Sequence, residues 1–341
     1  MRAWLLYGPE DARLVDAPRP EPRPGEVVLR VAAALTCGTD LKIYRRGSYP
    51  KIAGLPAPFG HELAGKVAAV GPGVDRFRPG QRVVAANSAP CGQCFFCRRQ
   101  RFSLCEDPVF FWGAFATYAT IPARIVDINL YPVPDGLPLA HAALMEPLAC
   151  TVRAVEVAEI QPGDQVAIVG GGALGLLLTR LAALAGAQVI VCDRHAERRQ
   201  VARAFGAAHV VDPSAGEPVA AVRALANGGR GADRVIEAVG TLEAWRQALA
   251  MARKGGTVLF FGGCAPGTAL EVDAGDLHYG ELTLKGTFHY HPRHAAAALG
   301  LITSGRVDPA PLLSGAFPLD GVLEALRRMA AREGLKYVIT P

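Results

Sequence analysis

The sequence contains no apolar run of 18 residues that is free of charges and helix breakers. A transmembrane helix needs such a run, so we expect no membrane-spanning segment and no membrane partner. The first residues, MRAWLLYGPEDARL, carry only a short apolar patch followed by acidic residues. They lack the longer apolar core and the small-residue cleavage site of a secretory signal peptide. Together these absences predict a cytoplasmic protein.

Long runs of like charge, internal repeats and low-complexity segments are also missing. The net charge is +5, and the basic residues do not gather in one stretch. Such a balance permits anionic ligands but does not require nucleic acid. With 341 residues, 50% of them hydrophobic, the chain is long enough for two domains with separate cores.

Eight cysteines are present, and four of them fall in the stretch CGQCFFCRRQRFSLC, residues 91–105. A reducing cytoplasm favours thiols and metal sites over disulfides, which argues against a disulfide knot. Two explanations remain from the residues alone: a zinc finger that binds nucleic acid, or a metal clip that stabilises another structure. Cys150, Cys192 and Cys264 fit no metal spacing, and we interpret them as buried thiols.

The first part of the chain, about 145 residues, contains short β-type runs separated by proline and glycine, with few helical patterns. It predicts a mainly β, barrel-like lobe. A helical stretch over 139–160 then precedes strands that alternate with helices, which is typical of a parallel doubly wound sheet in an α/β fold. The last strand, 335–340, has no βαβ partner, so we expect it to return to the first lobe. The expected β runs are 25–35, 65–71, 80–86 and 116–123, and the later strands are 165–169, 187–192, 209–212, 234–240, 256–263 and 282–288.

Gly170, Gly172 and Gly175 fit the pattern G-x-G-x-x-G, with Leu174 inside the turn. The pattern follows a buried-type strand and opens an apolar helix, which is the context that a dinucleotide-binding turn requires. In that role Gly170 allows the tight turn, Gly172 the approach of a pyrophosphate, and Gly175 the close packing of helix and strand. The helix start supplies amide donors and a positive dipole end. The alternative is a packing turn without cofactor.

Asp193 ends the next strand, about 20 residues after the turn. A carboxylate at this place accepts hydrogen bonds from a ribose 2′-hydroxyl and repels a 2′-phosphate, so the sequence favours NAD over NADP. Arg194 and Arg198 are nearby cations that would weaken this preference.

Cys37 follows an apolar strand, and His61 and Glu62 lie between a loop and another strand. All three residue types are competent zinc ligands, and three protein ligands with an open position would make a catalytic zinc. Each residue alone is weak evidence, because a single cysteine or histidine in a β domain more often packs in the core or lies on the surface.

Four ordered motifs make the chain resemble the zinc-dependent medium-chain alcohol and polyol dehydrogenases over nearly its whole length. The stretch from Gly60 to Val74 matches the zinc pattern G-H-E-x2-G-x5-G-x2-V of that family, and C-G-T-D from Cys37 stands where the family places its first ligand. The segment around Glu146, M-E-P-L, resembles the polyol and threonine dehydrogenase branch. The fourth motif is the family's structural-zinc lobe, matched by Cys91, Cys94, Cys97 and Cys105.

The resemblance implies two domains and two zinc ions per chain, one catalytic and one structural. Residues 1–147 and 290–341 would form a mainly β, GroES-like catalytic domain, with the structural-zinc lobe at 88–108. Residues 148–289 would form a dinucleotide-binding Rossmann domain. The four clustered cysteines would then be a structural clip, and not a nucleic-acid finger, which needs a recognition helix or a basic face with base contacts.

By this resemblance Cys37 and His61 are direct ligands of the catalytic zinc, and Glu62 and Glu146 compete for the third place. A carboxylate at a helix start, such as Glu146, is also favoured by the helix dipole alone. Thr39 would hydrogen-bond the substrate oxygen and relay its proton. Asp40 would accept a hydrogen bond from His61 and fix its tautomer, or else simply form an Asx turn.

Many relatives have a histidine five residues after the first cysteine, where it ends a proton relay, but this chain has Lys42. A lysine relays protons near pH 7 only if burial or nearby cations lower its pKa. Alternatively, Lys42 contacts the cofactor or an anionic substrate together with Arg45 and Arg46, or is simply solvated. Four aromatic residues, Phe110, Phe111, Trp112 and Phe115, either line the pocket or pack in the core. On the cofactor side the resemblance points to Val239, Gly262 and Thr287.

We therefore expect an NAD-dependent zinc oxidoreductase that oxidises a secondary alcohol of a polyol, sugar or amino alcohol to the ketone by reversible hydride transfer. Phosphorylated sugars and threonine are alternative substrates. A non-catalytic protein that binds zinc and NAD is the alternative from another class. We expect a small-molecule alcohol as partner, no nucleic acid, and a homo-oligomer, with a tetramer favoured over a dimer because the family forms both.

Overall fold

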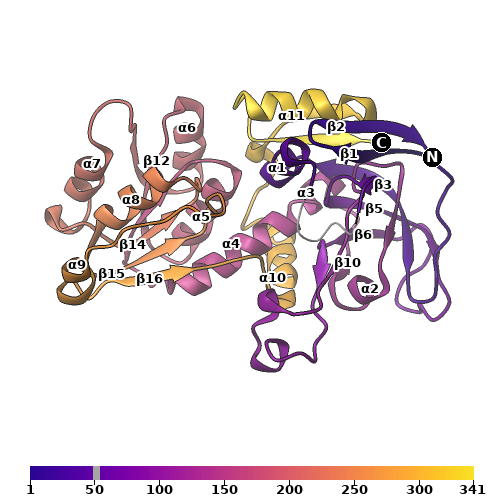
Figure 1. The fold of residues 1–341 in the computed structure, drawn as a ribbon, viewed down its shortest axis with the longest axis horizontal. Helices are drawn as coiled ribbons and strands as arrows, with labels where there is room; N and C mark the ends of the chain where they lie inside the picture. Colours follow the sequence, from indigo (N-terminus) through magenta and orange to yellow (C-terminus); the bar gives the residue numbers. More distant parts are fainter. Residues whose placement is uncertain (49–53) are drawn as a thin grey trace. The chain divides into compact units, whose positions relative to one another are not determined.

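The computed structural model describes residues 1–48 and 54–341. The chain divides into two compact units, which Figure 1 shows in the colours of the sequence. Unit 1 comprises Met1–Ala149 and Tyr290–Pro341, and unit 2 comprises Cys150–His289. None of the described helices combines the length and the apolar character that a bilayer crossing needs.

The main sheet of unit 1 is built on β3 (Val27–Leu35), most of whose residues are buried. β3 pairs antiparallel with β5 (Glu62–Val70), and β5 pairs with β6 (Arg82–Ala85). Valine dominates the buried positions of β3 and β6, because a branched side chain fits a pleated, buried surface. β9 (Tyr118–Ile121) pairs with β3 and β10 (Leu130–Pro132) with β6, which confirms the predicted mainly β lobe.

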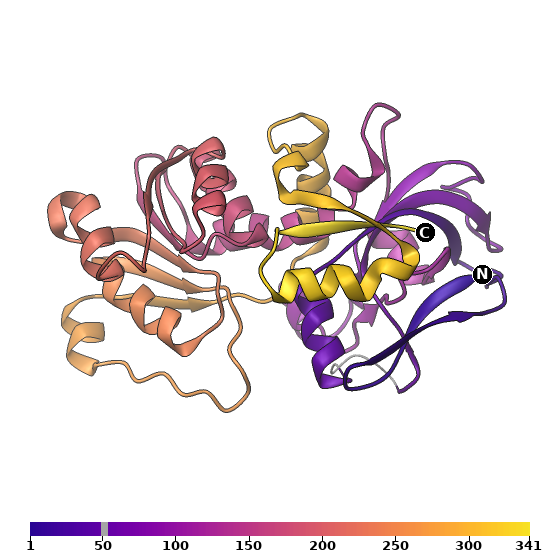
Figure 2. The ribbon, with the colours of Figure 1, turned by 90° about the horizontal axis from the view of Figure 1, so that it is seen from above.

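The end of the chain returns to this sheet. β18 (Lys336–Thr340) pairs antiparallel with β3 and parallel with β17 (Leu313–Pro318). α11 (Val322–Ala330) lies between the two strands in the sequence. Figure 2 shows this segment in yellow beside the dark N-terminal strands. The predicted return of the last strand is confirmed, whereas β17 was not predicted.

The remaining elements of unit 1 are short. β1 and β2 form an antiparallel hairpin, and β1 also pairs with β4. Few helical patterns were expected here, yet α1 and α2 are present, because a helix of this length shows little apolar periodicity. The bounds are β1 (Arg2–Gly8), β2 (Asp11–Asp16), β4 (Ala57–Pro58), β7 (Ser88–Ala89), β8 (Val109–Phe110), α1 (Gly38–Arg46), α2 (Ala123–Asn129), α10 (Pro292–Thr303), η4 (Ala310–Leu312) and η5 (Leu319–Gly321).

Aromatic residues fill part of the core of unit 1. Phe59 and Phe115 meet edge to face, with ring centroids 5.4 Å apart. Phe115 has no exposed surface and belongs to the same cluster as Leu29 and Ile121 of the main sheet. Of the two roles considered for Phe115, the structure shows core packing.

The helical stretch predicted over 139–160 is divided into α3 (Leu139–Ala142) and α4 (Met145–Ala158). Pro147 lies in the first turn of α4. Proline disrupts a helix interior but is tolerated in a first turn, where its missing N–H has no helical partner. The proline therefore begins a new helix and places Glu146 at its start.

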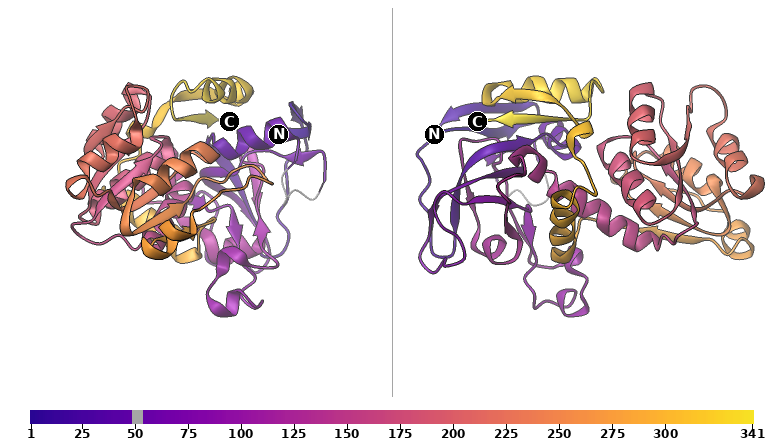
Figure 3. Two further views of the ribbon diagram at one scale, coloured as in Figure 1. Left: turned by 60° about the vertical axis from the view of Figure 1, so that its left-hand side comes forward. Right: turned by 180° about the vertical axis from the view of Figure 1, so that it is seen from behind.

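Unit 2 is a parallel sheet with the strand order β13-β12-β11-β14-β15-β16, which confirms the predicted doubly wound arrangement. The order reverses between β11 and β14, so right-handed crossovers place α5 and α6 on one face and α7 and α8 on the other. Both views of Figure 3 show helices packed against this sheet. The bounds are β11 (Gln165–Val169), α5 (Ala173–Leu184), β12 (Gln188–Cys192), α6 (Ala196–Ala204), β13 (Ala207–Val211), α7 (Pro218–Leu225), η3 (Asn227–Gly229), β14 (Ala232–Glu237), α8 (Leu242–Met251), β15 (Ala252–Phe260), α9 (Ala274–Tyr279) and β16 (Thr283–Gly286).

Candidate metal centres and cofactor site

The start of α1 fixes the first candidate ligand. Cys37 is the N-cap residue, and its Sγ accepts a hydrogen bond from the amide of Thr39 at 3.4 Å. In return the amide of Cys37 donates to Asp40 Oδ2 at 2.9 Å. This reciprocal cap is the arrangement of a capping box, and it holds the thiol at the helix start.

His61 is buried directly before β5 and is oriented by Asp40. Its Nδ1 lies 2.9 Å from Asp40 Oδ1, which leaves Nε2 as the atom available to a metal. Burial lowers the pKa of His61, but the Asp40 carboxylate and the Cys37 sulfur together outweigh burial and hold that pKa well above its usual value. The expected hydrogen bond between Asp40 and His61 is therefore confirmed, and Asp40 caps α1 as well.

Three ligand atoms converge here. The ligand atoms of Cys37, His61 and Glu62 all lie within 4.8 Å of one another. His61 Nε2 is 4.0 Å from Glu62 Oε1. Sulfur, imidazole nitrogen and carboxylate oxygen form a donor set that zinc accepts, so the residues present fit the ion.

A buried lysine from the far end of the chain faces the Glu62 carboxylate. Lys336, in β18, donates from Nζ to Glu62 Oε1 at 2.8 Å and to the carbonyl oxygen of Thr36 at 2.8 Å. Burial lowers the pKa of Lys336, but the negative charges of Glu62, Cys37 and Asp40 together outweigh burial and raise that pKa above its usual value. Sequence reasoning missed Lys336, because no motif marks it.

Glu146, the other candidate for the third ligand, lies outside the group formed by Cys37, His61 and Glu62 among the described residues. Its side chain is buried at the start of α4. Burial raises the pKa of Glu146 to about 7, although the charge of His61 pulls it down.

Two further predicted residues lie on α1. Thr39 is half-buried, and Lys42 is exposed. Within residues 1–48 and 54–341, the side chain of Lys42 makes no hydrogen bond or ion pair. Trp112 lies edge-on to His61, with ring centroids 5.4 Å apart, so this aromatic borders the candidate metal site and is not buried in the core.

The stretch 91–105, which we call the cysteine lobe, holds the second candidate metal centre. It contains two short turns of 3-10 helix, η1 (Cys97–Arg99) and η2 (Phe102–Leu104). Cys91 Sγ lies 3.9 Å from Cys97 Sγ, and Cys94 Sγ lies 3.9 Å from Cys105 Sγ. A tetrahedron with Zn–S bonds of about 2.3 Å has edges of about 3.8 Å, so the four thiols fit a zinc ion.

Backbone amides favour the thiolate form in the cysteine lobe. The amides of Gln93 and Cys94 lower the pKa of Cys91 to about 6. Burial acts in the opposite direction on Cys97 and raises its pKa to about 12. A zinc ligand must be deprotonated. Because the pKa of Cys91 is lowered, we expect this thiol to bind zinc first.

The glycine turn, residues 170–175, connects β11 to α5. Gly170 has φ of 103°, a left-handed conformation that favours glycine. Gly172 is the N-cap of α5, and a side chain there would meet open space, which leaves room for a ligand. A Cβ on Gly175 would collide with the carbonyl oxygen of Gly170. Leu174, which directly precedes Gly175, is half-buried.

Asp193 follows β12 and is bonded to the glycine turn. Its Oδ2 accepts from the amide of Gly171 at 2.8 Å, and its Oδ1 accepts from the amide of His195 at 2.8 Å. Arg198 NH1 lies 4.0 Å from Asp193 Oδ2, whereas Arg194 is exposed. The carboxylate is therefore fixed beside the turn with one arginine at its edge.

The other predicted cofactor residues lie beyond the carboxyl ends of their strands. Val239 follows β14, Gly262 follows β15, and Thr287 follows β16. Parallel strands bring these ends to the same edge of the sheet as Gly170, which is where open α/β sheets bind ligands.

Comparisons with known proteins agree with this geometry. The chain matches the family model of the alcohol dehydrogenase GroES-like domain over residues 23–135. It matches that of the zinc-binding dehydrogenases over residues 173–304. It is 30% identical to the sorbitol dehydrogenase of Bacillus subtilis strain 168, covering 100% of this chain and 97% of the relative. It is 33% identical to the L-threonine 3-dehydrogenase of Pyrococcus abyssi, covering 99% and 97%.

The chain belongs to the zinc-dependent medium-chain dehydrogenases. Its place is in their polyol and threonine dehydrogenase branch, and it is an oxidoreductase that uses zinc, a nicotinamide cofactor and an alcohol. Among solved structures it superposes with a TM-score of 0.93 on a protein from Sinorhizobium meliloti 1021 that has NADP bound, at 32% identity and with 100% and 99% of the two chains covered. The alcohol dehydrogenase TADH from Thermus sp. ATN1 gives 0.88 at 30% identity, covering 100% and 99%.

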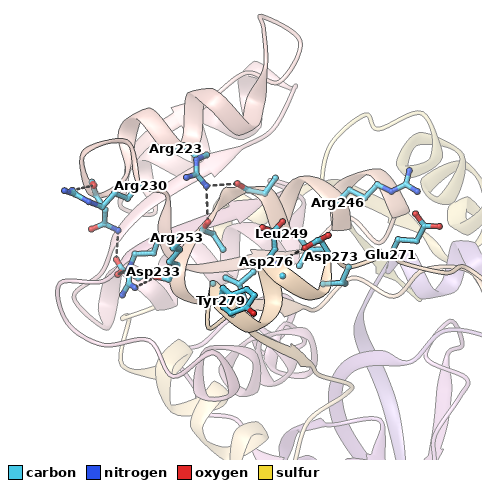
Figure 4. A pocket seen from close by; sticks show the side chains of 18 residues that line it. Arg223, Arg230, Asp233, Arg246, Leu249, Arg253, Glu271, Asp273, Asp276 and Tyr279 are labelled. Atoms are coloured by element: carbon cyan, nitrogen blue, oxygen red, sulfur yellow. Dashed lines mark hydrogen bonds and ion pairs between the residues drawn. The ribbon is translucent and has the colours of Figure 1, made fainter.

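Unit 2 of the dehydrogenase also contains a groove. It has a volume of about 1120 Å³ and is lined by residues of α7, α8, β15 and α9, none of them a predicted metal or cofactor residue. Figure 4 shows Arg230, Arg253 and Asp233 at one end and Arg246 and Glu271 at the other. Charges of both signs line it.

The three cysteines of the dehydrogenase that were interpreted as buried thiols differ in exposure. Cys192 is buried in β12, whereas Cys150 and Cys264 are only half-buried. For Cys264 the reason is its place in the loop after β15, where the chain has left the sheet. The interpretation was therefore right for Cys192 alone.

Proposed function

We propose that this dehydrogenase oxidises a secondary hydroxyl of a polyol, a sugar or an amino alcohol to a ketone, with zinc held by Cys37, His61 and Glu62. The convergence of these three ligand atoms within 4.8 Å carries the proposal. Zinc in such a set is a Lewis acid that lowers the pKa of a hydroxyl, and NAD accepts the hydride. The sorbitol and threonine dehydrogenase relatives, whose named substrates carry secondary hydroxyls, support this substrate class.

The side chains of unit 1 take distinct roles in this proposal. Asp40 orients His61 through their hydrogen bond of 2.9 Å. Thr39, two residues after Cys37, hydrogen-bonds the substrate oxygen and relays its proton. Lys42 is exposed, so it lacks the burial that is one of the two conditions favouring a relaying lysine. Lys42 therefore contacts an anionic group of the substrate or cofactor, which keeps sugar phosphates among the candidates.

We further propose two zinc ions per chain and a preference for NAD. The second ion binds in the cysteine lobe, where the spacing of the thiols supports it. Asp193, fixed beside the glycine turn, repels a 2′-phosphate, while Arg198 at its edge limits that preference. Unit 1 serves as the catalytic domain and unit 2 as the dinucleotide-binding domain. No disulfide joins any of the described cysteines, which fits a reducing compartment such as the cytoplasm.

A homo-tetramer completes the proposal. Among the described residues β16 pairs only with β15, so one edge of the sheet of unit 2 is open. Tyr279, just before this edge, is 80% exposed. A second apolar patch lies on the cysteine lobe, where Phe95 is 54% and Leu104 49% exposed. Two separate patches fit an assembly with two kinds of interface, as a D2 tetramer has.

The test is a spectrophotometric screen with polyols, sugars, amino alcohols and sugar phosphates, run with NAD and NADP in parallel on protein of measured zinc content. We expect NAD-linked oxidation of a secondary alcohol. Cys37→Ser should lower kcat/KM by about a thousandfold or more, because several kcal/mol of Lewis-acid stabilisation is lost. Cys264→Ser is the matched control, because this half-buried thiol belongs to none of the groups of described residues that could hold a metal ion.

The outcomes separate the competing functions. Wild-type activity in Cys37→Ser would contradict the zinc mechanism. Turnover only of phosphorylated alcohols would assign Lys42 to the phosphate, and threonine turnover would select the second candidate that the Pyrococcus abyssi relative supports. Tight NAD binding without turnover of any compound would favour the non-catalytic alternative.

A further inference from the structure

Glu237 lies at the point where the strand order of unit 2 reverses. It is the last residue of β14, in register with Val169 at the end of β11 and with Phe260 at the end of β15. The order reverses between β11 and β14. In open α/β sheets the ligand crevice lies outside the carboxyl ends of the strands at this switch point.

The carboxylate of Glu237 is fully buried and binds the turn that follows it. Its Oε1 accepts from the amides of Val239 and Gly240, both at 2.7 Å. Bonds to an ionised acceptor are shorter and stronger than neutral ones. Burial raises the pKa of Glu237, although the two amides pull it down. The carboxylate therefore has a positional task that a buried apolar residue could not perform.

The turn held by Glu237 contacts the glycine turn. Val239 is 45% exposed, and a Cβ on Gly170 would lie 2.6 Å from its Cγ2. The side chain of Val239 thus stands directly against the first glycine of the glycine turn. Any shift of the Val239–Gly240 turn changes the wall of the crevice beside that glycine.

The same turn is clamped from the other side by the end of β15. A Cβ on Gly262 would collide with the amide nitrogen of Gly240 and lie 2.7 Å from Glu237 Oε2. The carbonyl oxygen of Gly262 accepts from Trp245 Nε1 at 2.9 Å, which fixes this second loop. The ends of three strands therefore meet around one carboxylate.

We propose that Glu237 is a positioning residue for the nicotinamide cofactor: its carboxylate holds the Val239–Gly240 turn against the glycine turn and thereby sets dinucleotide affinity. This inference rests on the proposed role of unit 2 as the cofactor domain. Glu237 itself is buried and acts through Val239. Its loss leaves two turn amides without an acceptor and lets the wall of the crevice move.

The test is calorimetric titration of the zinc-loaded enzyme with NAD. We expect Glu237→Ala to weaken NAD binding by about tenfold or more, the effect of losing one or two charge-assisted hydrogen bonds. Glu237→Gln keeps an oxygen for both amides and should stay within about threefold of wild type. At saturating NAD, kcat and the KM for the alcohol should be nearly unchanged in both variants, which a general structural defect would not allow.

A glycine pair tests the same turn without touching the carboxylate. Gly262→Ala should weaken NAD binding, because its Cβ displaces Gly240. Gly216→Ala is the matched control in unit 2, since a Cβ there meets nothing within 4 Å. If Glu237→Ala does not fold, the NAD affinity of Gly262→Ala tests the role of the turn instead.

The results distinguish this inference from the proposed function. A wild-type protein that binds neither NAD nor NADP would refute the cofactor site itself. A wild-type protein that binds NAD, with folded Glu237→Ala or Gly262→Ala binding equally well, would refute only the role of Glu237. A fall in kcat with unchanged NAD affinity would refute it too.

Discussion

Lys336 is a buried cation that faces a buried carboxylate. Its Nζ lies 2.8 Å from each carboxylate oxygen of Glu62, and the two side chains are 4% and 0% exposed. Removing one partner of such a pair leaves the other charged in a medium of low dielectric constant, which costs far more than the pair contributes. The pair lies directly beside the candidate zinc ligands, so its energetics depend on the metal.

We predict that Lys336→Met destabilises the zinc-free protein by about 3–5 kcal/mol, because the buried Glu62 carboxylate loses the cation that contacts both of its oxygens and keeps, among the described residues, only His61, whose Nε2 is 4.0 Å from Oε1. Zinc bound beside Glu62 supplies positive charge, so the loss of stability should be smaller when zinc is present. Urea unfolding of wild type and variant, with and without a chelator, measures both quantities.

Arg13→Met is the control for Lys336→Met. Arg13 pairs with Asp11 at 2.7 Å, but both side chains are well exposed, and such pairs contribute little. We expect no measurable change in its unfolding curve. A Lys336→Met protein as stable as wild type after zinc removal would contradict the account given of this pair.

At the residue scale, short-range partners could be predicted from the sequence and distant ones could not. The hydrogen bond between Asp40 and His61 could be predicted, because each residue stands in a motif of the family. Lys336 is 274 residues from Glu62, in a strand whose pattern shows only that it is buried. The motifs do not distinguish Glu62 from Glu146 as the third zinc ligand, because both carboxylates stand in matching motifs, and the proposal of Glu62 rests on the coordinates.

At the scale of elements, Asp233 ties together the amino end of the sheet of unit 2. It lies in β14, and its Oδ2 accepts from the amide of Gln165 in β11 at 2.7 Å and from Asn227 Nδ2 at 3.1 Å. Its Oδ1 accepts from Arg253 Nε, in β15, at 2.6 Å. One carboxylate thus joins β11, β14, β15 and η3.

This arrangement predicts a dependence of stability on pH. Burial raises the pKa of Asp233, but its three donors outweigh burial and lower that pKa below its usual value. An unfolded aspartate titrates near pH 3.9, so between the two pKa values the unfolded chain binds more protons. The stability from Asp233 is therefore complete above about pH 5 and is lost as pH falls through the lower, folded pKa.

Asp233→Asn should reduce the free energy of unfolding at pH 7 by about 2 kcal/mol, since it loses the charge-assisted bonds. The free energy of unfolding of this variant should also fall less steeply than that of wild type between about pH 5 and pH 3, because an asparagine does not titrate. Denaturant titrations across that range measure both effects. Asp75→Asn, at an exposed aspartate, should reproduce the wild-type profile, and a parallel fall in all three proteins would refute the prediction.

Among the helices and strands, those with a clear apolar pattern could be predicted from the sequence, whereas helices too short to show one could not. β11, α5 and β12 were predicted closely, because a buried strand, a glycine turn and an apolar helix reinforce one another. α9 has six residues, too few to show helical periodicity, and it was missed. The break between α3 and α4 was missed too, although Pro147 was its visible signal.

At the scale of the whole molecule, the cysteine lobe connects metal content with assembly. Its regular structure consists of the short turns η1 and η2, so zinc has to supply the cross-links that a core supplies elsewhere. Phe95 is exposed on this lobe, with the guanidinium of Arg99 3.7 Å from its ring centroid. The proposed interface at Phe95 therefore depends on the zinc ion proposed for the lobe.

We predict that Cys97→Ser lowers the zinc content from about two ions per chain to about one, because a tetrahedral site loses a buried ligand. The assembly should become smaller than a tetramer, while NAD affinity stays unchanged, since the cofactor residues belong to unit 2. Elemental analysis, light scattering and calorimetry measure these three quantities, and Cys264→Ser serves as control. Two retained zinc ions would refute the metal assignment of the lobe, and one zinc with an unchanged tetramer would refute its role as an interface.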